Sequence, residues 1–321
     1  MKKILFFLTM VLTSLIVSSC GQEELSVENY SNEPVTYLLP FGAGGQSDIE
    51  ARRQMPFLEE KLDTDITINY QDGAGGAIAW STHVREDSSE RLITGINIPH
   101  IILQPMTRND TGYETDQINP IALFQGTPIG LAVHKDSDIE TLEEFIEEAN
   151  GDNNMTVSGA GTYSGHHLAF MQLVSIEGLD MEYIPSTGAS EALQNFLGGN
   201  TDAILTNSND LLAYKDEIKI LAMGSEERFD QLPDIPTFQE EGVDLTARID
   251  RGVAVPPGTD EAVVQMLEEA FLEISNDDSV QEKMKKEGFE PIAMGREETE
   301  KYIDELTVEF EQVMRELGEI E

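Results

Sequence analysis

The chain is poor in cysteine, tryptophan and basic residues. Cys20 is its only cysteine, Trp80 is its only tryptophan, and it has five histidines in 321 residues. A single cysteine excludes an internal disulfide and a cysteine-ligated metal cluster. After the first twenty residues no run is apolar enough to span a bilayer. A membrane-spanning segment is therefore not expected after residue 20.

Positive charge is also scarce, because 20 Lys and Arg face 61 Asp and Glu, for a formal net charge of −41. Nucleic-acid binding is excluded, since phosphate contacts need clustered Lys and Arg. The acidic residues are spread through the chain, and regular apolar periodicity argues against disorder. We expect an acidic surface suited to high salt, where a Debye length of about 3 Å at 1 M screens self-repulsion.

The first residues have the pattern of a secretory signal peptide. Lys2 and Lys3 precede a short apolar run, and Ser18 and Ser19 lead to Cys20. We expect residues 1–19 to be removed and Cys20 to be lipidated, because Val-Ser-Ser-Cys resembles a lipobox. A plain signal peptide with an incidental cysteine is the alternative. Residues 20–33 are polar and acidic, which predicts a lipidated tether that holds the folded part outside the cytoplasm at a membrane surface.

The body alternates strand-like and helix-like segments, which predicts an α/β fold with mostly parallel sheets flanked by helices. A helix is expected from about Ser47, with Ser47 or Asp48 as its N-cap and a kink or break at Pro56. The expected strands are 35–39, 66–70, 92–98, 129–134, 155–158, 181–184, 203–206, 218–223 and 248–255. The other expected helices are 77–84, 141–149, 165–175, 190–197, a helix beginning near 262, and 296–317.

Two glycine-rich loops, 40–48 and 72–77, each lie between a strand and a helix. Glycines let backbone N–H groups approach a ligand, and a helix N-terminus favours negative charge. Together such loops can hold an anion without a charged side chain, although each is also compatible with a tight turn alone. Neither loop has the Gly-Lys-Ser/Thr of a P-loop or the full dinucleotide spacing. We therefore expect no nucleotide cofactor.

Several motifs together resemble the substrate-binding family of tripartite tricarboxylate transporters, also called Bug proteins. The resemblance runs from about Val35 to the C-terminus. The matching stretches are Leu39-Pro-Phe-Gly-Ala-Gly-Gly-Gln-Ser-Asp48 with Arg52, Asp72-Gly-Ala-Gly-Gly76, Ser158-Gly-Ala-Gly-Thr-Tyr-Ser-Gly-His-His-Leu168, Tyr183-Ile-Pro-Ser-Thr-Gly188, Leu197-Gly-Gly-Asn-Thr-Asp202, Leu221-Ala-Met-Gly-Ser-Glu-Glu-Arg-Phe229, Leu232-Pro-Asp-Ile-Pro-Thr-Phe-Gln-Glu-Glu-Gly242 and Ala254-Val-Pro-Pro-Gly-Thr259.

The resemblance implies a two-lobe type II periplasmic-binding-protein fold with a ligand cleft between the lobes. Lobe one is expected at 34–124 plus 251–321, and lobe two at 125–250. The implied function is capture of a small carboxylate (a di- or tricarboxylate, or an aromatic acid) for membrane permease subunits. We expect a monomer with no catalysis, no cofactor and no metal.

The resemblance also implies a ligand site made largely of backbone amides and hydroxyls. From lobe one the matching positions are Phe41, Gly44, Gly45, Ser47, Asp48, Ala74, Gly75 and Gly76. From lobe two they are Gly161, Thr162, Ser164, Ser186, Thr187 and Gly188. The chain departs from the family pattern at Ser186 and Thr187, where an aromatic and a basic residue are common, and at 249–251, where a Trp is common. These differences bear on the identity of the ligand.

Other residues have simpler explanations beside their functional ones. Asp48 either caps a helix and pairs with Arg52, or contacts ligand. Trp80 is expected in the core and not against a ligand. His166 and His167 are adjacent and point in different directions, which makes a poor metal pair. Two further functions stay open: a sensor module for a membrane receptor kinase, and a secreted hydrolase. The hydrolase needs a nucleophile and base together, which no motif here supplies.

Overall fold

The computed structural model describes residues 24–151 and 154–321, so the expected signal peptide and Cys20 lie outside the described residues. The strands are β1 (Val35–Leu39), β2 (Ile66–Tyr70), β3 (Leu92–Ile98), β4 (Asn119–His134), β5 (Met155–Gly159), β6 (Met181–Pro185), β7 (Ala203–Asn207), β8 (Ile218–Met223), β9 (Arg248–Val255) and β10 (Glu290–Gly295).

The helices follow most of the strands in turn. They are α1 (Gln46–Leu62), α2 (Ala77–His83), α3 (His100–Thr107), α4 (Leu142–Ala149), α5 (Gly165–Glu177), α6 (Ala189–Leu197), α7 (Ser208–Tyr214), α8 (Glu261–Ser275), α9 (Asp278–Lys286) and α10 (Arg296–Glu316), with short 3-10 helices at Tyr30–Asn32, Ala74–Gly76 and Thr115–Gln117. α3, α7, α9 and β10 were not expected from the sequence.

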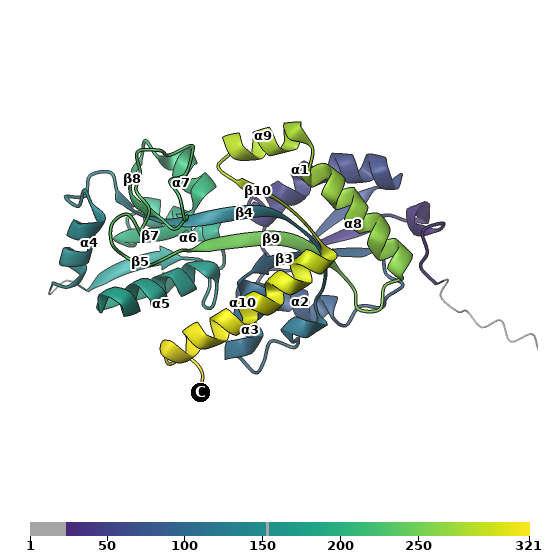
Figure 1. Cartoon of the computed structure of the whole chain (residues 1–321), viewed down its shortest axis with the longest axis horizontal. Helices are drawn as coiled ribbons and strands as arrows, with labels where there is room; N and C mark the ends of the chain where they lie inside the picture. Colours follow the sequence, from purple (N-terminus) through teal and green to yellow (C-terminus); the bar gives the residue numbers. More distant parts are fainter. Residues whose placement is uncertain (1–23, 152–153) are drawn as a thin grey trace, which may run out of the picture.

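One sheet runs through the molecule in the order β2-β1-β3-β9-β4-β7-β5-β6, with β8 and β10 also paired to β4. The outer pairs are parallel, as expected, whereas β4 and β9 pair antiparallel with all their neighbours. Figure 1 shows β4 and β9 side by side along the middle of the molecule. They join a first region (β1, β2, β3 and β10) to a second region (β5, β6, β7 and β8).

β4 is much longer than the expected 129–134, because it also includes residues 119–128. Pro120 and Pro128 obscured its first half, since proline cannot donate to a sheet ladder and suggests a break. The register between β4 and β9 shifts between Pro120 and Ala122, and again between Leu123 and Gln125. These irregularities let a proline-containing strand stay in the middle of a sheet.

α1 shows how the first region positions a loop. Gly45 is its N-cap, so the expectation of Ser47 or Asp48 was wrong by two or three residues. Both residues are instead buried in the first turn. The helix continues through Pro56 to Leu62, so the expected break is absent from this helix. The early start places the first turn of α1 directly after the glycine-rich loop.

Separate apolar cores hold the two regions. Tyr37 of β1 and Phe271 of α8 lie in a core of the first region, and Phe145 of α4 lies in a core of the second. Leu25 and Tyr30 also pack into the first core. Residues 24–33, which were expected to continue a flexible tether, therefore belong to the folded body.

Trp80 is fully buried, and its indole Nε1 donates a 3.0 Å hydrogen bond to the carbonyl of Gly95. The expectation of a core tryptophan is confirmed. Among the residues that the structure describes, no helix combines the length and the apolarity needed to cross a bilayer.

Candidate functional site

A cavity of about 270 Å³ lies where the two regions face each other beside β9. Strand-to-helix loops of both regions form its walls. Its lining residues are Phe41, Gly42, Ala43, Gly45, Gln46, Ser47, Asp72, Asn97, His100, Ala160, His166, Thr187, Gly188, Ala189, Ser190, Glu191, Gln194, Ile249 and Arg251. The volume and the mixed lining suit one small polar molecule.

The first wall is the loop between β1 and α1. Gly45 caps α1 and has no side chain to bond the first-turn amides, which leaves the N-terminus of the helix open to the cavity. Gly44 has φ of +78°, a conformation that glycine adopts without strain. Its N–H donates a 2.8 Å hydrogen bond to Oδ2 of Asp48 and is therefore already engaged.

The opposite wall is the loop between β6 and α6. Gly188 caps α6, so a second helix begins at the cavity without a side-chain cap. The N–H and the hydroxyl of Thr187 donate hydrogen bonds of 2.8 and 2.6 Å to Oε2 of Glu191. Two glycine-capped helix termini, one from each region, therefore face the same space, and both favour negative charge.

The floor consists of side chains that are almost completely buried. Asn97 comes from the end of β3, His100 from α3, His166 from α5 and Arg251 from β9. Their exposed fractions are 2% for Asn97, His100 and His166, and 5% for Arg251. The ring of Phe41 packs edge-on against His100, with 5.7 Å between ring centroids.

Several polar atoms of this floor have no hydrogen-bond partner within residues 24–151 and 154–321. They are Asn97 Oδ1, His100 Nδ1, His166 Nδ1 and Nε2, and Arg251 Nε. Buried polar groups in proteins are usually bonded, and an unbonded one costs about 1–3 kcal/mol. Their concentration around one cavity indicates a place where a polar molecule binds.

Arg251 supplies a positive charge at the floor. Burial lowers the pKa of its guanidinium to about 10, while the nearby carboxylates of Asp210, Glu50 and Asp250 oppose that shift. It therefore stays protonated at neutral pH. Its Nη1 donates a 2.5 Å hydrogen bond to Oγ1 of Thr127, which fixes the guanidinium beside β4.

Both histidines of the floor are neutral. Burial and the charge of Arg251 lower the pKa of His166 to about 3, with a smaller opposing effect from Asn207. Burial also lowers the pKa of His100 far below its usual range, helped by His166 and Arg251. A neutral imidazole carries one N–H donor and one acceptor nitrogen. Each ring can therefore donate one hydrogen bond to a ligand and accept one.

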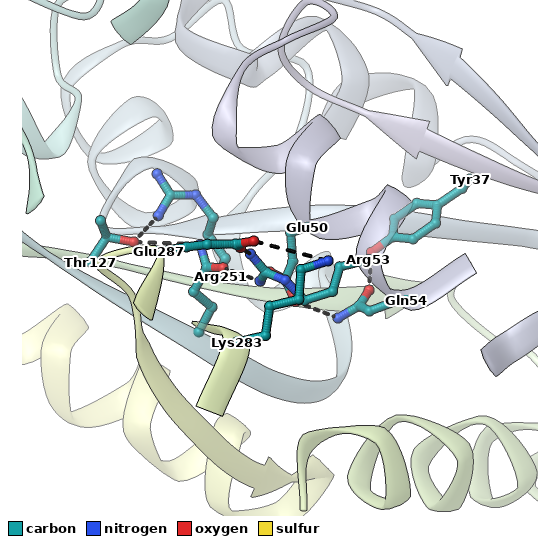
Figure 2. A network of polar contacts seen from close by, with 9 residues as sticks. Tyr37, Glu50, Arg53, Gln54, Thr127, Arg251, Lys283 and Glu287 are labelled. Atoms are coloured by element: carbon teal, nitrogen blue, oxygen red, sulfur yellow. Dashed lines mark hydrogen bonds and ion pairs between the residues drawn. The ribbon is translucent and has the colours of Figure 1, made fainter. Parts of the chain in front are cut away.

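Arg251 also belongs to a buried polar network (Figure 2). Arg53 of α1 forms a hydrogen-bonded ion pair with Glu50 and donates a 3.1 Å bond to Gln125 of β4. Burial raises the pKa of Glu50 to about 7, although Arg53 and Arg251 lower it. This network ties α1 to β4 and β9 behind the cavity.

The structure places five of the sequence-predicted residues on the cavity: Phe41, Gly45, Ser47, Thr187 and Gly188.

Three other predicted residues have structural roles outside the cavity lining. Of the two roles considered for Asp48, the structure shows the pairing with Arg52. Its Oδ1 accepts hydrogen bonds of 2.9 Å from Arg52 and 2.6 Å from the hydroxyl of Tyr70. Ser164 caps α5 by accepting a bond from the N–H of His167. The hydroxyl of Ser186 accepts a 3.1 Å bond from Asn195.

Ala74, Gly75 and Gly76 lie outside the cavity lining, and so do Gly161 and Thr162. The two loops contact each other instead, since a Cβ added to Gly161 would lie 3.8 Å from Cα of Gly75. Nε2 of Gln104 on α3 donates a 2.8 Å bond across the same junction to the carbonyl of Thr162. These residues join the two regions beside the cavity.

Sequence reasoning missed the floor residues. His166 was set aside with His167 because adjacent histidines make a poor metal pair, and Arg251 was noted only as a departure from the family pattern. The available signal was that Arg251 lies in an expected strand directly before the apolar residues 252–255, where a buried arginine needs a partner or a ligand. Asn97 lies near the end of the buried strand β3 and His100 begins α3, but α3 was not expected, so their position at the cavity was not recognised.

Solved structures with the same fold come from periplasmic binding proteins. BugD is 24% identical with a TM-score of 0.84, over 90% of this chain and 99% of that one. A Rhodopseudomonas palustris protein solved with adipate is 22% identical (TM-score 0.84, covering 89% and 97%). MatC from Rhodopseudomonas palustris with bound malate is also 22% identical (TM-score 0.82, covering 88% and 98%). These likenesses confirm the type II periplasmic-binding-protein fold. Residues 51–319 match the tripartite tricarboxylate transporter family receptor, and the chain therefore belongs to that family.

Proposed function

We propose that this chain captures a small carboxylate outside the cytoplasm and delivers it to the permease subunits of a tripartite tricarboxylate transporter. The observation that carries the proposal is the cavity between the two regions. Two glycine-capped helix termini and Arg251 converge there, and all three favour an anion. Relatives with the same fold hold adipate and malate, which supports a carboxylate as the ligand class.

We infer that residues 34–124 plus 251–321 and residues 125–250 act as two lobes. Ligand bridges the α1 loop of one lobe and the α6 loop of the other, so only the closed arrangement makes both sets of contacts. β4 and β9 connect the lobes and serve as the hinge. The permease subunits distinguish the closed form from the open one.

Calorimetry and thermal unfolding of ligand-free protein test the binding step. Protein purified under denaturing conditions and refolded is titrated with di- and tricarboxylates and with aromatic acids. A ligand at 100 times its Kd stabilises the folded state by about 2.7 kcal/mol. We expect at least one member of the panel to produce saturable heat and this stabilisation. Failure of every member overturns the proposal.

The membrane anchor is tested separately. Cys20 is proposed to carry the lipid that holds the protein at the membrane surface, with residues 21–23 linking it to the folded body. Cys20→Ser is expected to move the protein from the membrane fraction to the soluble extracytoplasmic fraction with ligand affinity unchanged. A membrane-bound Cys20→Ser protein contradicts the anchor and leaves the binding result intact.

A further inference from the structure

The floor of the cavity offers hydrogen-bond acceptors as well as donors. Arg251 Nε is a donor only, whereas Asn97 Oδ1 is an acceptor only. Neither has a partner in the part of the chain that the structure describes. A carboxylate of a ligand has only acceptor oxygens, so it satisfies Arg251 and leaves Asn97 without a donor. The floor is therefore not fully matched by an unsubstituted carboxylate.

Asn97 and Arg251 are direct neighbours in the sheet. They are paired across the antiparallel strands β3 and β9, and both line the cavity. Side chains of residues directly opposite in an antiparallel pair lie on one face, with Cβ atoms about 5 Å apart. Ile249, two residues before Arg251 on the same face, also lines the cavity. A carboxylate on Arg251 thus places its adjacent carbon atom close to Asn97.

His166 adds a group that matches a hydroxyl. Both of its ring nitrogens are buried without a partner among the described residues, and its depressed pKa keeps the ring neutral. A neutral ring carries a donor on one nitrogen and an acceptor on the other, and the two point in different directions, so one ligand group bonds one of them. A hydroxyl has the same dual character, so it can donate to Asn97 Oδ1 and accept from the imidazole N–H.

We propose that Asn97, His166 and Arg251 form a subsite for a hydroxycarboxylate, in which Arg251 binds the carboxylate and Asn97 accepts a hydrogen bond from the neighbouring hydroxyl. This rests on the proposed function and narrows its ligand class. The two helix termini remain for a second anionic group of the same ligand. An ammonium group in place of the hydroxyl is repelled by Arg251 and cannot accept a hydrogen bond from the imidazole N–H, so we expect it to fit the subsite less well, although Asp72 and Glu191 also line the cavity.

The test on the wild-type protein uses three four-carbon dicarboxylates that differ in one substituent: succinate, malate and aspartate. Binding of each to refolded, ligand-free protein is measured by calorimetry. We expect malate to bind at least about tenfold more tightly than succinate, because succinate leaves the buried acceptor unpaired. We expect aspartate to bind more weakly than malate. The proposal is overturned if malate and succinate bind with equal affinity, as expected for a floor that binds only water. It is also overturned if aspartate binds more tightly than malate.

Substitutions assign the effect to residues. Asn97→Leu keeps a similar shape and removes the acceptor, so it is expected to bring the malate-to-succinate affinity ratio close to one. Arg251→Gln is expected to weaken both ligands by at least about tenfold. Arg315→Gln, an arginine change on the exposed face of α10, is the matched control and leaves all three affinities unchanged. A retained ratio in folded Asn97→Leu contradicts the role of Asn97.

The outcomes separate the two proposals. If no carboxylate of any kind binds, the proposed function fails. If carboxylates bind but malate and succinate bind equally, the proposed function stands and the hydroxycarboxylate subsite fails. The wild-type comparison needs no folded variant, so a variant that does not fold cannot hide either result.

Discussion

Arg53 of α1 and Glu287, which directly follows α9, are joined by a 2.6 Å hydrogen bond from Nη2 to Oε2. They are 234 residues apart in the sequence. The same guanidinium pairs with buried Glu50 and lies over the ring of Phe289 at 4.9 Å. One arginine therefore connects α1 to the segment that follows α9 (Figure 2).

Removing that arginine is expected to destabilise the fold strongly. Arg53→Leu leaves Glu50 buried without its cation, and such a change typically costs about 3–5 kcal/mol. We expect a loss of about 3 kcal/mol in the free energy of unfolding at pH 8, measured by urea denaturation. Arg315→Leu breaks a half-exposed pair with Glu311 and serves as the control, with a loss below about 1 kcal/mol. Similar losses for both variants contradict a structural role for the buried pair.

Glu50 also makes a prediction about pH. Burial raises its pKa from 4.5 to about 7 in the folded protein. Between these values the folded state keeps a proton that the unfolded chain has released, so the contribution of Glu50 to stability falls as pH rises. The Glu50→Gln variant does not show this fall in stability, because the glutamine side chain does not titrate. We expect the stability of the variant relative to wild type to increase by about 3 kcal/mol from pH 4.5 to pH 8.

Urea denaturation of both proteins at a series of pH values measures this difference. The difference between variant and wild type is used because two buried histidines change stability with pH in the opposite direction. They are His83 and His166, with folded pKa values of about 4 and 3. Their protonation favours the unfolded state as pH falls, and it is common to both proteins. A difference that stays flat across the range contradicts a raised pKa at Glu50.

The sequence was informative where one local pattern determined one element. β8 and β9 lie at the expected residues, because each contains several apolar residues and ends before a breaker, Gly224 after β8 and Pro256 after β9. The walls of the cavity were also identified in part, since glycine-rich loops before helices have a visible composition. Phe41 and Gly45 of the loop 40–48 line the cavity, whereas Gly188, which also lines it, was expected only from the family resemblance.

What the sequence did not reveal depends on contacts between distant segments. Pro120 and Pro128 are unfavourable in the middle of a sheet, yet β4 continues because β9 and β10 pair with it from both sides. The cavity floor depends on the pairing of β3 with β9, which puts Asn97 opposite Arg251. Neither residue belongs to a local motif, so their proximity follows only from the sheet order.

Closure of the cavity is expected to depend on Gln104. Its Nε2 donates bonds of 2.8 Å to the carbonyl of Thr162 and 3.3 Å to that of Tyr163, from one region to the other. Gln104→Ala removes contacts that join the two regions, and the two bonds from this one amide together contribute about 1 kcal/mol. We expect about fivefold weaker binding of malate by calorimetry.

The control for this variant is Gln312→Ala, which removes an exposed bond to Glu316 on α10 and is expected to leave affinity unchanged. Small-angle scattering of the ligand-free proteins provides a second measurement. A larger radius of gyration for Gln104→Ala than for wild type is expected. Unchanged affinity and an unchanged radius together contradict a role for Gln104 in closure.

Salt is expected to strengthen binding, contrary to the usual behaviour of an anion site. A carboxylate approaches a chain with a formal charge of −41, and surface repulsion is screened within about 3 Å at 1 M salt. Arg251 is 5% exposed, so its attraction for bound ligand is screened much less. From 0.1 to 2 M KCl we therefore expect the association rate of malate to rise and Kd to fall or stay level. Stopped-flow fluorescence and calorimetry measure the two quantities, and an affinity that falls steadily with added salt contradicts this balance of surface and buried charge.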